Sequence, residues 1–339
     1  MTLQVTVLIP TAGRPHLIEN TFNGLQTQNF KDFKVLLVLK SSDVETIELA
    51  ERFSKYLDIQ IVFQKRRGLI EAYNEGIDNA RGDVIVFLDD DAIPESNCIN
   101  EHVLTYEQNN ISGVSGDVIP AYFENGILKP IRNSSEIASF YLESEILRMI
   151  GDKLWNSPLE GQEGYLAYIS KAGYPRKNIC VMRQEMISSL LCMAANMSIL
   201  NSALKSIRIP TSFLNRGIDF EQVLGWKLWR NGHRMVFNPK ARVYHILHGQ
   251  TMSRSLNMVN VSKAFMEDEL VFYYLFLERE KLSKMHRIVS LLYNSLVHIK
   301  KTRGNWKYEV AALRGILLGN VIGIKWLISK KTGGTYTPL

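Results

Sequence analysis

The sequence predicts an α/β fold: a mostly parallel, mononucleotide-binding sheet flanked by helices and followed by a C-terminal helical extension. In the first third of the chain, short apolar runs without polar alternation follow one another, and segments of helical spacing separate them. Helical patterns and basic residues gather towards the C-terminus. The 339 residues are enough for one large domain with an extension.

Strands and helices alternate from the N-terminus in this prediction. Strands buried on both faces belong to a parallel sheet, and ligands of such sheets bind beyond the carboxyl ends of the strands. The residues that follow each strand are therefore the first candidates for a site. The strands are expected at 5–9, 33–39, 59–63 and 84–88, and the helices at 15–27, 44–56 and 69–80.

The middle of the chain is less regular. A strand is expected at 112–119, and loops with short helices are expected from about 122 to 184, where glycines and prolines interrupt the pattern. Order returns after residue 188, with a helix expected at 217–231 and a strand at 241–246. Beyond residue 261 the pattern is helical, including apolar segments at 265–277, 288–299 and 310–328.

These patterns predict a catalytic domain over residues 1–255 and a tail over residues 256–339. Within the domain we expect a nucleotide-binding half at about 1–120 and an acceptor half at about 121–255. From Lys281 onwards the chain has eleven basic residues and one acidic residue, so this part carries +10 and the preceding part −4. Such asymmetry predicts that the tail meets something anionic.

The tail is expected to lie on a membrane surface rather than to cross a bilayer. Its longest uncharged run, residues 315–324, is ten residues long, whereas a spanning helix needs roughly 20 apolar residues. A basic amphipathic tail can bind anionic lipid, and the alternative is a helical cap packed on the domain. The N-terminus lacks the pattern of a signal peptide. We therefore expect a cytoplasmic protein, peripheral on the inner face of the cell membrane.

Three consecutive carboxylates, Asp89, Asp90 and Asp91, follow the fourth expected strand directly. Adjacent carboxylates at the end of a buried strand repel one another unless a cation compensates. Mn²⁺ and Mg²⁺ prefer carboxylate oxygen and bridge to substrate phosphates. Spacing of two along an extended chain puts Asp89 and Asp91 on one side, which predicts that they hold the metal. The alternative is a solvated acidic turn or a helix cap.

The turn after the first strand is the second candidate. Pro10, Thr11 and Ala12 are small or rigid, Arg14 is basic, and Pro15 opens the next helix. Backbone amides at such a turn can contact a base or a phosphate. The sequence has no GxxxxGK[ST] phosphate loop and no GxGxxG fingerprint. Both absences argue against an ATPase and against a dehydrogenase.

Two further groups lie downstream. Asp219 and Glu221 stand at the start of an expected helix, where a carboxylate can act as a general base or can simply cap the helix. His245 ends the last expected strand, and we predict it as a third metal ligand or a phosphate contact. His248 follows as a weaker candidate for the same role.

Taken together and in this order, these segments resemble the inverting family 2 glycosyltransferases of the GT-A fold, over roughly residues 4–250. The resemblance extends to an Ala-Ala-Asn element and to the helix that follows the family's Glu-Asp motif. The segments that carry it are Val7–Thr11, Gly68–Gly76, Asp89–Asp91, Ala194–Met197 and Trp229–Gly232.

The resemblance implies a metal-dependent enzyme that moves a sugar from a nucleotide-diphosphate donor to an acceptor hydroxyl with inversion. It implies Mn²⁺ or Mg²⁺ as the cofactor, with the last aspartate of the motif as a ligand. The tail is similar to those of enzymes that act on lipid-linked or cell-surface glycans. The residues expected to contact the donor are Pro10, Thr11, Ala12, Arg14, Asp43, Gly68, Asn74, Asp89 and Asp90.

The sequence departs from the family at three places. Asp43 stands a few residues beyond the usual acidic position after the second strand. Tyr73 precedes Asn74 where the family often has arginine. The Glu-Asp pair is not intact, so we expect Glu221 to be the base and keep Asp219 as the alternative.

Two other classes of function stay open from the sequence. A nucleotidyltransferase also uses a carboxylate-held metal at the end of a parallel strand, but it releases pyrophosphate. A non-catalytic nucleotide- or nucleic-acid-binding module would use the basic tail, although no DNA- or RNA-binding motif is recognisable. Neither the sugar nor the acceptor follows from the sequence.

Overall fold

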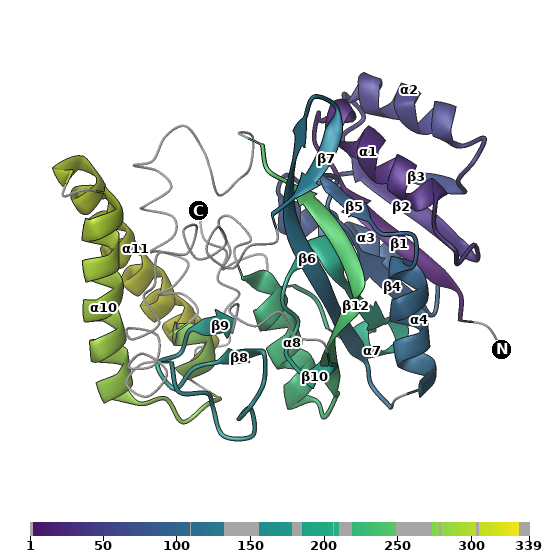
Figure 1. The fold of residues 1–339 in the computed structure, drawn as a ribbon. Coiled ribbons are helices and arrows are strands. Elements are labelled where there is room, and N and C mark those ends of the chain that lie inside the picture. The colour runs from purple at the N-terminus through teal and green to yellow at the C-terminus, as the bar shows by residue number, and fades with distance from the viewer. Residues whose placement is uncertain are drawn as a thin grey trace.

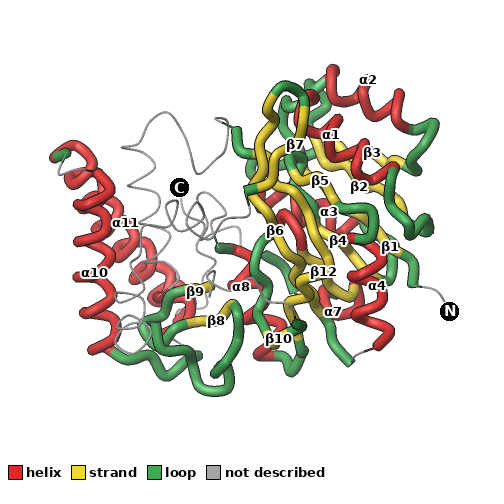
Figure 2. Tube along the Cα trace, in the orientation of Figure 1, coloured by secondary structure: helices red, strands yellow, loops and turns green. Residues whose placement is uncertain are grey.

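A computed structural model shows one large sheet with helices packed on it and a helical pair to one side (Figure 1). Among the described residues, ten strands join this sheet, and β8 (Ala167–Ile169) and β9 (Pro175–Lys177) form a separate two-stranded sheet (Figure 2). The predicted α/β class is therefore confirmed. The structure describes residues 3–108, 110–131, 156–177, 185–205, 207–209, 219–248, 273–277, 279–302 and 305–331.

The first half of the sheet is parallel, in the order β4-β1-β2-β3. All six residues of β1 are buried, because strands at the centre of a helix-covered sheet meet apolar side chains on both faces. The predicted strands and helices are confirmed here to within a few residues. The elements are β1 (Val5–Pro10), α1 (Pro15–Gln26), β2 (Phe33–Leu39), α2 (Val44–Phe53), β3 (Ile59–Phe63), α3 (Leu69–Asn79) and β4 (Val84–Phe87).

The second half of the sheet is mixed. Strand β11 runs antiparallel to both β4 and β6, and β12 then pairs in parallel with β6. The short strand β5, directly after the aspartates, pairs antiparallel with β12. The elements are β5 (Ala92–Pro94), α4 (Cys98–Gln108), β6 (Gly113–Glu124), β7 (Ile127–Pro130), β8 (Ala167–Ile169), β9 (Pro175–Lys177), β10 (Ile187–Ser188), the 3₁₀ helix η1 (Ala194–Asn196), β11 (Met197–Leu200), α7 (Asn201–Leu204), α8 (Phe220–Arg230) and β12 (Met235–Ile246).

Helices α10 (Lys284–Thr302) and α11 (Trp306–Lys331) form the C-terminal pair. The segment before them is fixed to α8, where Trp226 Nε1 donates a hydrogen bond of 2.6 Å to Glu280 Oε1. The Trp226 ring also meets Phe276 edge-on at 4.9 Å. Of the helix expected at 265–277, residues 265–272 lie outside the described residues, and 273–277 are helical.

A buried chain of hydrogen bonds joins α4 to η1 and β11. His102 Nε2 lies 2.8 Å from Asn196 Oδ1, and His102 Nδ1 lies 2.8 Å from Ser198 Oγ. Since the amide oxygen of Asn196 can only accept, Nε2 carries the proton and Nδ1 accepts from the serine hydroxyl. Tyr106 Oη, 2.9 Å from Ser198 Oγ, then donates to the serine. All of these hydrogen bonds can form together only while His102 is neutral.

This arrangement makes the stability of the fold dependent on pH. Burial lowers the pKa of His102 from 6.5 to about 4, so the unfolded chain takes up the proton first as the pH falls. Stability is therefore lost between pH 6.5 and 4, by up to about 3 kcal/mol in the free energy of unfolding. Urea unfolding across this range should show a smaller pH-dependent loss in His102→Gln than in the unsubstituted protein. His16→Gln, at an exposed histidine of α1, is the control and should keep the full loss. An equal loss in all three proteins would contradict the assignment.

Candidate metal and nucleotide site

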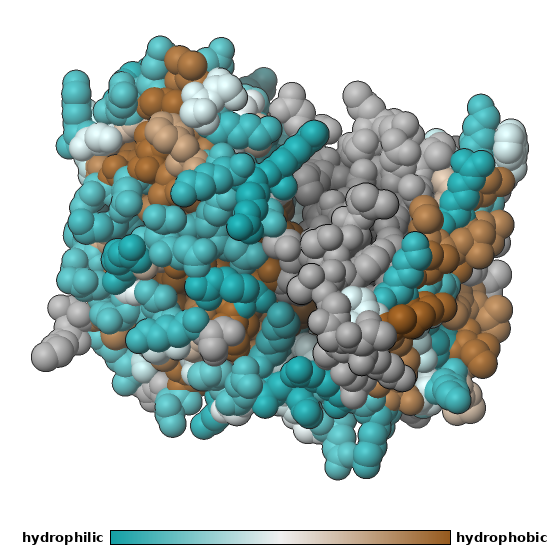
Figure 3. Space-filling view, turned by 180° about the vertical axis from the view of Figure 1, so that it is seen from behind, coloured by the Kyte–Doolittle hydropathy of each residue, from teal (hydrophilic) through white to brown (hydrophobic). Residues whose placement is uncertain are grey.

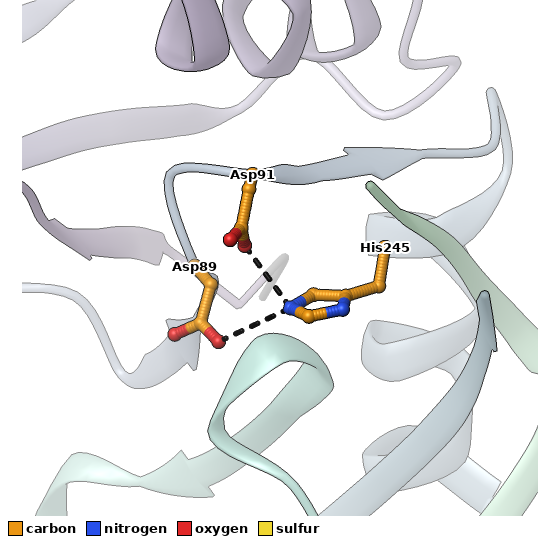
Figure 4. Close-up of side chains that lie close together, drawn as sticks. All are labelled: Asp89, Asp91 and His245. Carbon is orange, nitrogen blue, oxygen red and sulfur yellow. Dashed lines mark ion pairs between the residues drawn. The ribbon is translucent and has the colours of Figure 1, made fainter. Parts of the chain in front are cut away.

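Asp89, Asp91 and His245 converge at the carboxyl end of β4 (Figure 4). His245 Nε2 lies 3.1 Å from Asp91 Oδ1 and 3.9 Å from Asp89 Oδ2. One ligand atom from each of the three residues lies within 4.8 Å of the other two. The structure thus brings together the three residues that the sequence nominated as metal ligands.

Backbone pairing places His245 opposite the aspartates. In the β5–β12 pair, His245 stands across from Ala92, the residue that follows Asp91. The amide of Ile246 also donates to the carbonyl oxygen of Asp91 at 2.9 Å. The position of the imidazole is therefore set by the pairing of β12 with β5.

The two candidate carboxylate ligands have different surroundings. Asp89 accepts a hydrogen bond of 2.8 Å from the hydroxyl of Tyr73. Burial, and next the charge of Asp91, raise its pKa. Burial acts in the same direction on Asp91, but hydrogen bonding and charge from His245, together with His248 and Arg14, lower the pKa of Asp91 to about 2. His248 Nε2 lies 2.7 Å from Asp91 Oδ2.

Asp90 faces a different set of partners. Its Oδ2 accepts from Thr11 Oγ1 at 2.6 Å and from Arg14 Nε at 3.1 Å, and its Oδ1 accepts from Arg14 Nη2 at 2.5 Å. Burial raises the pKa of Asp90 to about 7, against the opposing charge of Arg14. Asp90 therefore fastens the turn after β1 to the end of β4, and Arg14 extends from there to 3.7 Å from Asp91.

The turn after β1 also contacts the turn after β2. Gly13, with a positive φ of 65°, donates its amide to Asp43 Oδ2 at 2.7 Å. The other oxygen of Asp43 accepts from the amide of Thr46 and caps α2. Ala12 is exposed between these contacts, while Pro10 and Thr11 are buried. Asp43 thus holds two strand-end turns side by side.

Gly68 and Asn74 lie at and in α3. Gly68 precedes the helix with a φ of 123°, a conformation that side chains rarely adopt. The Asn74 amide donates to the carbonyl oxygen of Ile209 at 2.8 Å, and its oxygen accepts from the Ile209 amide at 3.0 Å. Asn74 therefore anchors residues 207–209 on α3.

The two candidate bases stand at the start of α8. Glu221 is 9% exposed, and its Oε1 accepts from the amide of Ala194 in η1 at 3.0 Å. Asp219 has a left-handed φ of 55°, uncommon for a residue other than glycine, and its side chain does not cap the helix. Residues 217 and 218, which opened the predicted helix, lie outside the described residues.

The Ala-Ala-Asn element, which forms η1, packs next to Glu221 and is itself held by hydrogen bonds. Asn196 Nδ2 donates to the carbonyl oxygens of Asp117 and Ala241, so it ties η1 to β6 and β12. A side chain at Gly116 would collide with Asn196 and with the carbonyl of Ala241. The amide of Ala194 is thereby held where it meets Glu221.

The donor set fits a divalent cation. Two carboxylates and one imidazole supply oxygen and nitrogen ligands, and Mn²⁺ accepts both kinds. Arg14 supplies positive charge beside the carboxylates, since it pairs with Asp90 and lies 3.7 Å from Asp91.

Sequence reasoning gave no role to Tyr73 or to the Ala194 amide, and it placed His248 below His245 as a candidate. In the structure His248 contacts Asp91. The spacing of three residues between His245 and His248 was visible, whereas the Tyr73 contact depends on how α3 packs.

Comparison with known proteins gives the same family as the sequence patterns. The sequence profile of Glycosyl transferase family 2 matches residues 6–174, about half of the chain. Glycosyltransferase AglE of Haloferax volcanii is 29% identical over 126 residues, which are 36% of this chain and 41% of that protein. The GalNAc(5)-diNAcBac-PP-undecaprenol beta-1,3-glucosyltransferase of Campylobacter jejuni is 30% identical over 91 residues, 26% of this chain and 29% of that protein. The chain thus spans less than half the length of either relative.

Solved structures share the fold. Mannosyltransferase PcManGT from Pyrobaculum calidifontis, in complex with GDP-Man and Mn²⁺, superposes with a TM-score of 0.51 at 16% identity, covering 100% of this chain and 82% of that one. S. aureus TarS 1-349 in complex with UDP-GlcNAc gives a TM-score of 0.55 at 14% identity, covering 98% and 93%. These likenesses confirm the GT-A fold.

Proposed function

Because this chain belongs to glycosyltransferase family 2, we propose that it transfers a sugar from a nucleoside-diphosphate donor to an acceptor hydroxyl, with inversion at the anomeric carbon. The observation that carries the proposal is the convergence of Asp89, Asp91 and His245 at the end of β4. This is the position at which an open α/β sheet receives its ligand. The bound nucleotide sugars and Mn²⁺ in structures of the same fold agree with this choice of ligand.

Asp89, Asp91 and His245 would hold Mn²⁺ or Mg²⁺. When bound, such an ion supplies positive charge that stabilises the departing diphosphate. The residues of this chain keep the three ligands close before any ion arrives. Tyr73 holds Asp89, His248 holds Asp91, and β12 fixes His245.

The donor nucleotide would lie over the turns after β1 and β2. Pro10, Thr11 and Ala12 offer backbone groups there, and Gly68 leaves room at the start of α3. Asp90 and Asp43 would support the nucleotide indirectly, because their carboxylates accept hydrogen bonds that fix the turn after β1. Arg14 adds a guanidinium next to the carboxylates. Asn74 contributes by keeping residues 207–209 against α3.

Glu221 would accept the proton of the acceptor hydroxyl as the new glycosidic bond forms. The Ala194 amide orients its carboxylate, and its charge reaches Tyr73, beside the metal ligands. Asp219, which directly precedes the helix, is the alternative base. A single displacement by the deprotonated hydroxyl gives inversion.

The first test uses a panel of UDP-, GDP- and dTDP-sugars with Mn²⁺. The unsubstituted protein should release one nucleoside diphosphate, and Asp91→Asn should lose at least about 100-fold in rate because a ligand charge is removed. Asp58→Asn is the control, since Asp58 is exposed and pairs with exposed Lys34 at the opposite end of β2 from the aspartates. Release of pyrophosphate from a nucleoside triphosphate and a sugar 1-phosphate, assayed in parallel, would instead indicate a nucleotidyltransferase. No metal-dependent release from either set of substrates would contradict an enzymatic role.

The base is tested by comparing Glu221→Gln with Asp219→Asn at saturating Mn²⁺ and donor. If Glu221 is the base, Glu221→Gln should lower kcat for transfer by about 100- to 10,000-fold, because the amide cannot take the proton. Donor binding, measured by calorimetry, should be preserved in both variants. A larger loss of kcat in Asp219→Asn would transfer the assignment to Asp219.

The acceptor would be a lipid-linked or cell-surface glycan. The C-terminal helices would hold the protein at the membrane surface, close to this acceptor. The undecaprenol-linked substrate named for the Campylobacter relative favours this class. Within the described residues, one helix, Trp306–Ser329, is long and apolar enough to cross a membrane by length and composition. Figure 3 shows hydrophobic residues along the outer edge of the helical pair.

Helix α11 buries small residues and exposes large ones. Ala311, Gly315, Gly319 and Gly323 form its inner face, and the ring of Tyr274 fills the space beside Gly323. This order suits a helix whose outer face meets lipid, where close packing of small residues joins helices. Arg314 and Lys325 on the same helix can reach anionic headgroups. The exposed outer residues are Trp306, Val310, Leu313, Leu317, Val321, Ile324 and Ile328.

Membrane contact is tested by sedimentation with vesicles of mixed neutral and anionic lipid. Binding should fall with salt but persist in part, because burial of apolar side chains is not screened. Leu317→Asp should weaken partitioning by about tenfold or more, from the lost transfer energy of one leucine. Ile127→Asp, at an equally exposed position of β7, is the control and should leave binding unchanged. Salt-sensitive binding to DNA without binding to vesicles would favour a nucleic-acid partner.

A further inference from the structure

We propose that Tyr73 is a positioning residue that fixes the orientation of Asp89 as a metal ligand and couples it to the start of α8, where the candidate base stands. The inference rests on the proposed metal site. It concerns a residue at which this chain departs from the resembled family's usual arginine.

The hydroxyl of Tyr73 determines how Asp89 is oriented. It donates to Asp89 Oδ1 at 2.8 Å, while the other oxygen, Oδ2, faces His245 at 3.9 Å. Within the described part of the chain, no other side chain donates a hydrogen bond to this carboxylate. Asp89 is also the more accessible ligand, with a side chain 31% exposed against 5% for Asp91. Without the hydroxyl, the carboxylate could rotate away from the metal position.

The ring of Tyr73 supplies the coupling. It is fully buried and lies between Phe87 at the end of β4, 5.7 Å away, and Phe220 at the start of α8, 5.0 Å away. Phe220 immediately precedes Glu221. One side chain therefore touches the strand that presents the aspartates and the helix that presents the candidate base. A shift of either element has to displace this ring.

The hydroxyl and the ring can be tested separately. Tyr73→Phe keeps the ring and removes the hydrogen bond, so it should weaken Mn²⁺ binding about tenfold, as loss of a partner behind a ligand does. The dissociation constant is measured from the electron paramagnetic resonance signal of free Mn²⁺, without donor or acceptor. At saturating Mn²⁺, the kcat of Tyr73→Phe should recover to that of the unsubstituted protein, a recovery that general damage to the fold would not allow.

Tyr106→Phe is the matched control. Tyr106 is also a buried tyrosine whose hydroxyl bonds a side chain, here that of Ser198. It should leave Mn²⁺ affinity unchanged even if stability falls. Tyr73→Leu removes the ring as well, and its kcat should remain low at saturating Mn²⁺ because the start of α8 loses its support.

The outcomes are distinguishable. Unchanged Mn²⁺ affinity in Tyr73→Phe would overturn the role of the hydroxyl, and full recovery of kcat in Tyr73→Leu would overturn the coupling. Equal weakening in Tyr106→Phe would indicate general destabilisation and would also overturn the inference. Failure of the unsubstituted protein to bind Mn²⁺ would instead overturn the proposed metal site, together with everything that rests on it.

Discussion

The repulsion among three adjacent carboxylates is the constraint on which the rest of the site depends. Asp89, Asp90 and Asp91 follow a buried strand, where charge is poorly solvated. The chain meets this cost by sending the three side chains to different partners. Asp90 turns to Thr11 and Arg14, while its two neighbours turn to His245. Asp90 thus fixes the turn after β1, and Asp89 and Asp91 remain as the candidate ligands of a cation.

The mixed half of the sheet serves this division. The parallel strands alone would leave the aspartates without a partner strand beyond the carboxyl end of β4. The antiparallel pairing of β5 with β12 supplies that partner. It also places His245, more than 150 positions away in sequence, beside the aspartates. Both His245 and His248 then stand against Asp91. A site assembled by strand pairing keeps its geometry without a bound ion, which limits the reorganisation needed on binding.

The sequence predicted those parts of the fold and site that local pattern controls. The parallel strands, the aspartate run and the ends of α1 and α3 follow from apolar runs and turn residues. The role of Tyr73 does not, because a tyrosine in a helix is usually part of the core and only the packing of α3 against β1 and β2 brings its hydroxyl to Asp89. The pairing of the Asn74 amide with Ile209, 135 residues away, does not follow from local pattern either. The antiparallel β11 was likewise hidden, since strand direction is decided by distant partners.

The contact between Trp226 and Glu280 joins the C-terminal helices to the helix that begins with the candidate base. This hydrogen bond and the contact between Trp226 and Phe276 hold the segment before the helical pair against α8. If the outer face of α11 rests in a bilayer, the reaction centre stands at a fixed height above the lipid plane. Acceptors would then be selected by how far their reactive hydroxyl projects from the membrane, and the enzyme would act as a ruler for the growing glycan. Chain length, rather than sugar identity alone, would decide when the next residue can be added.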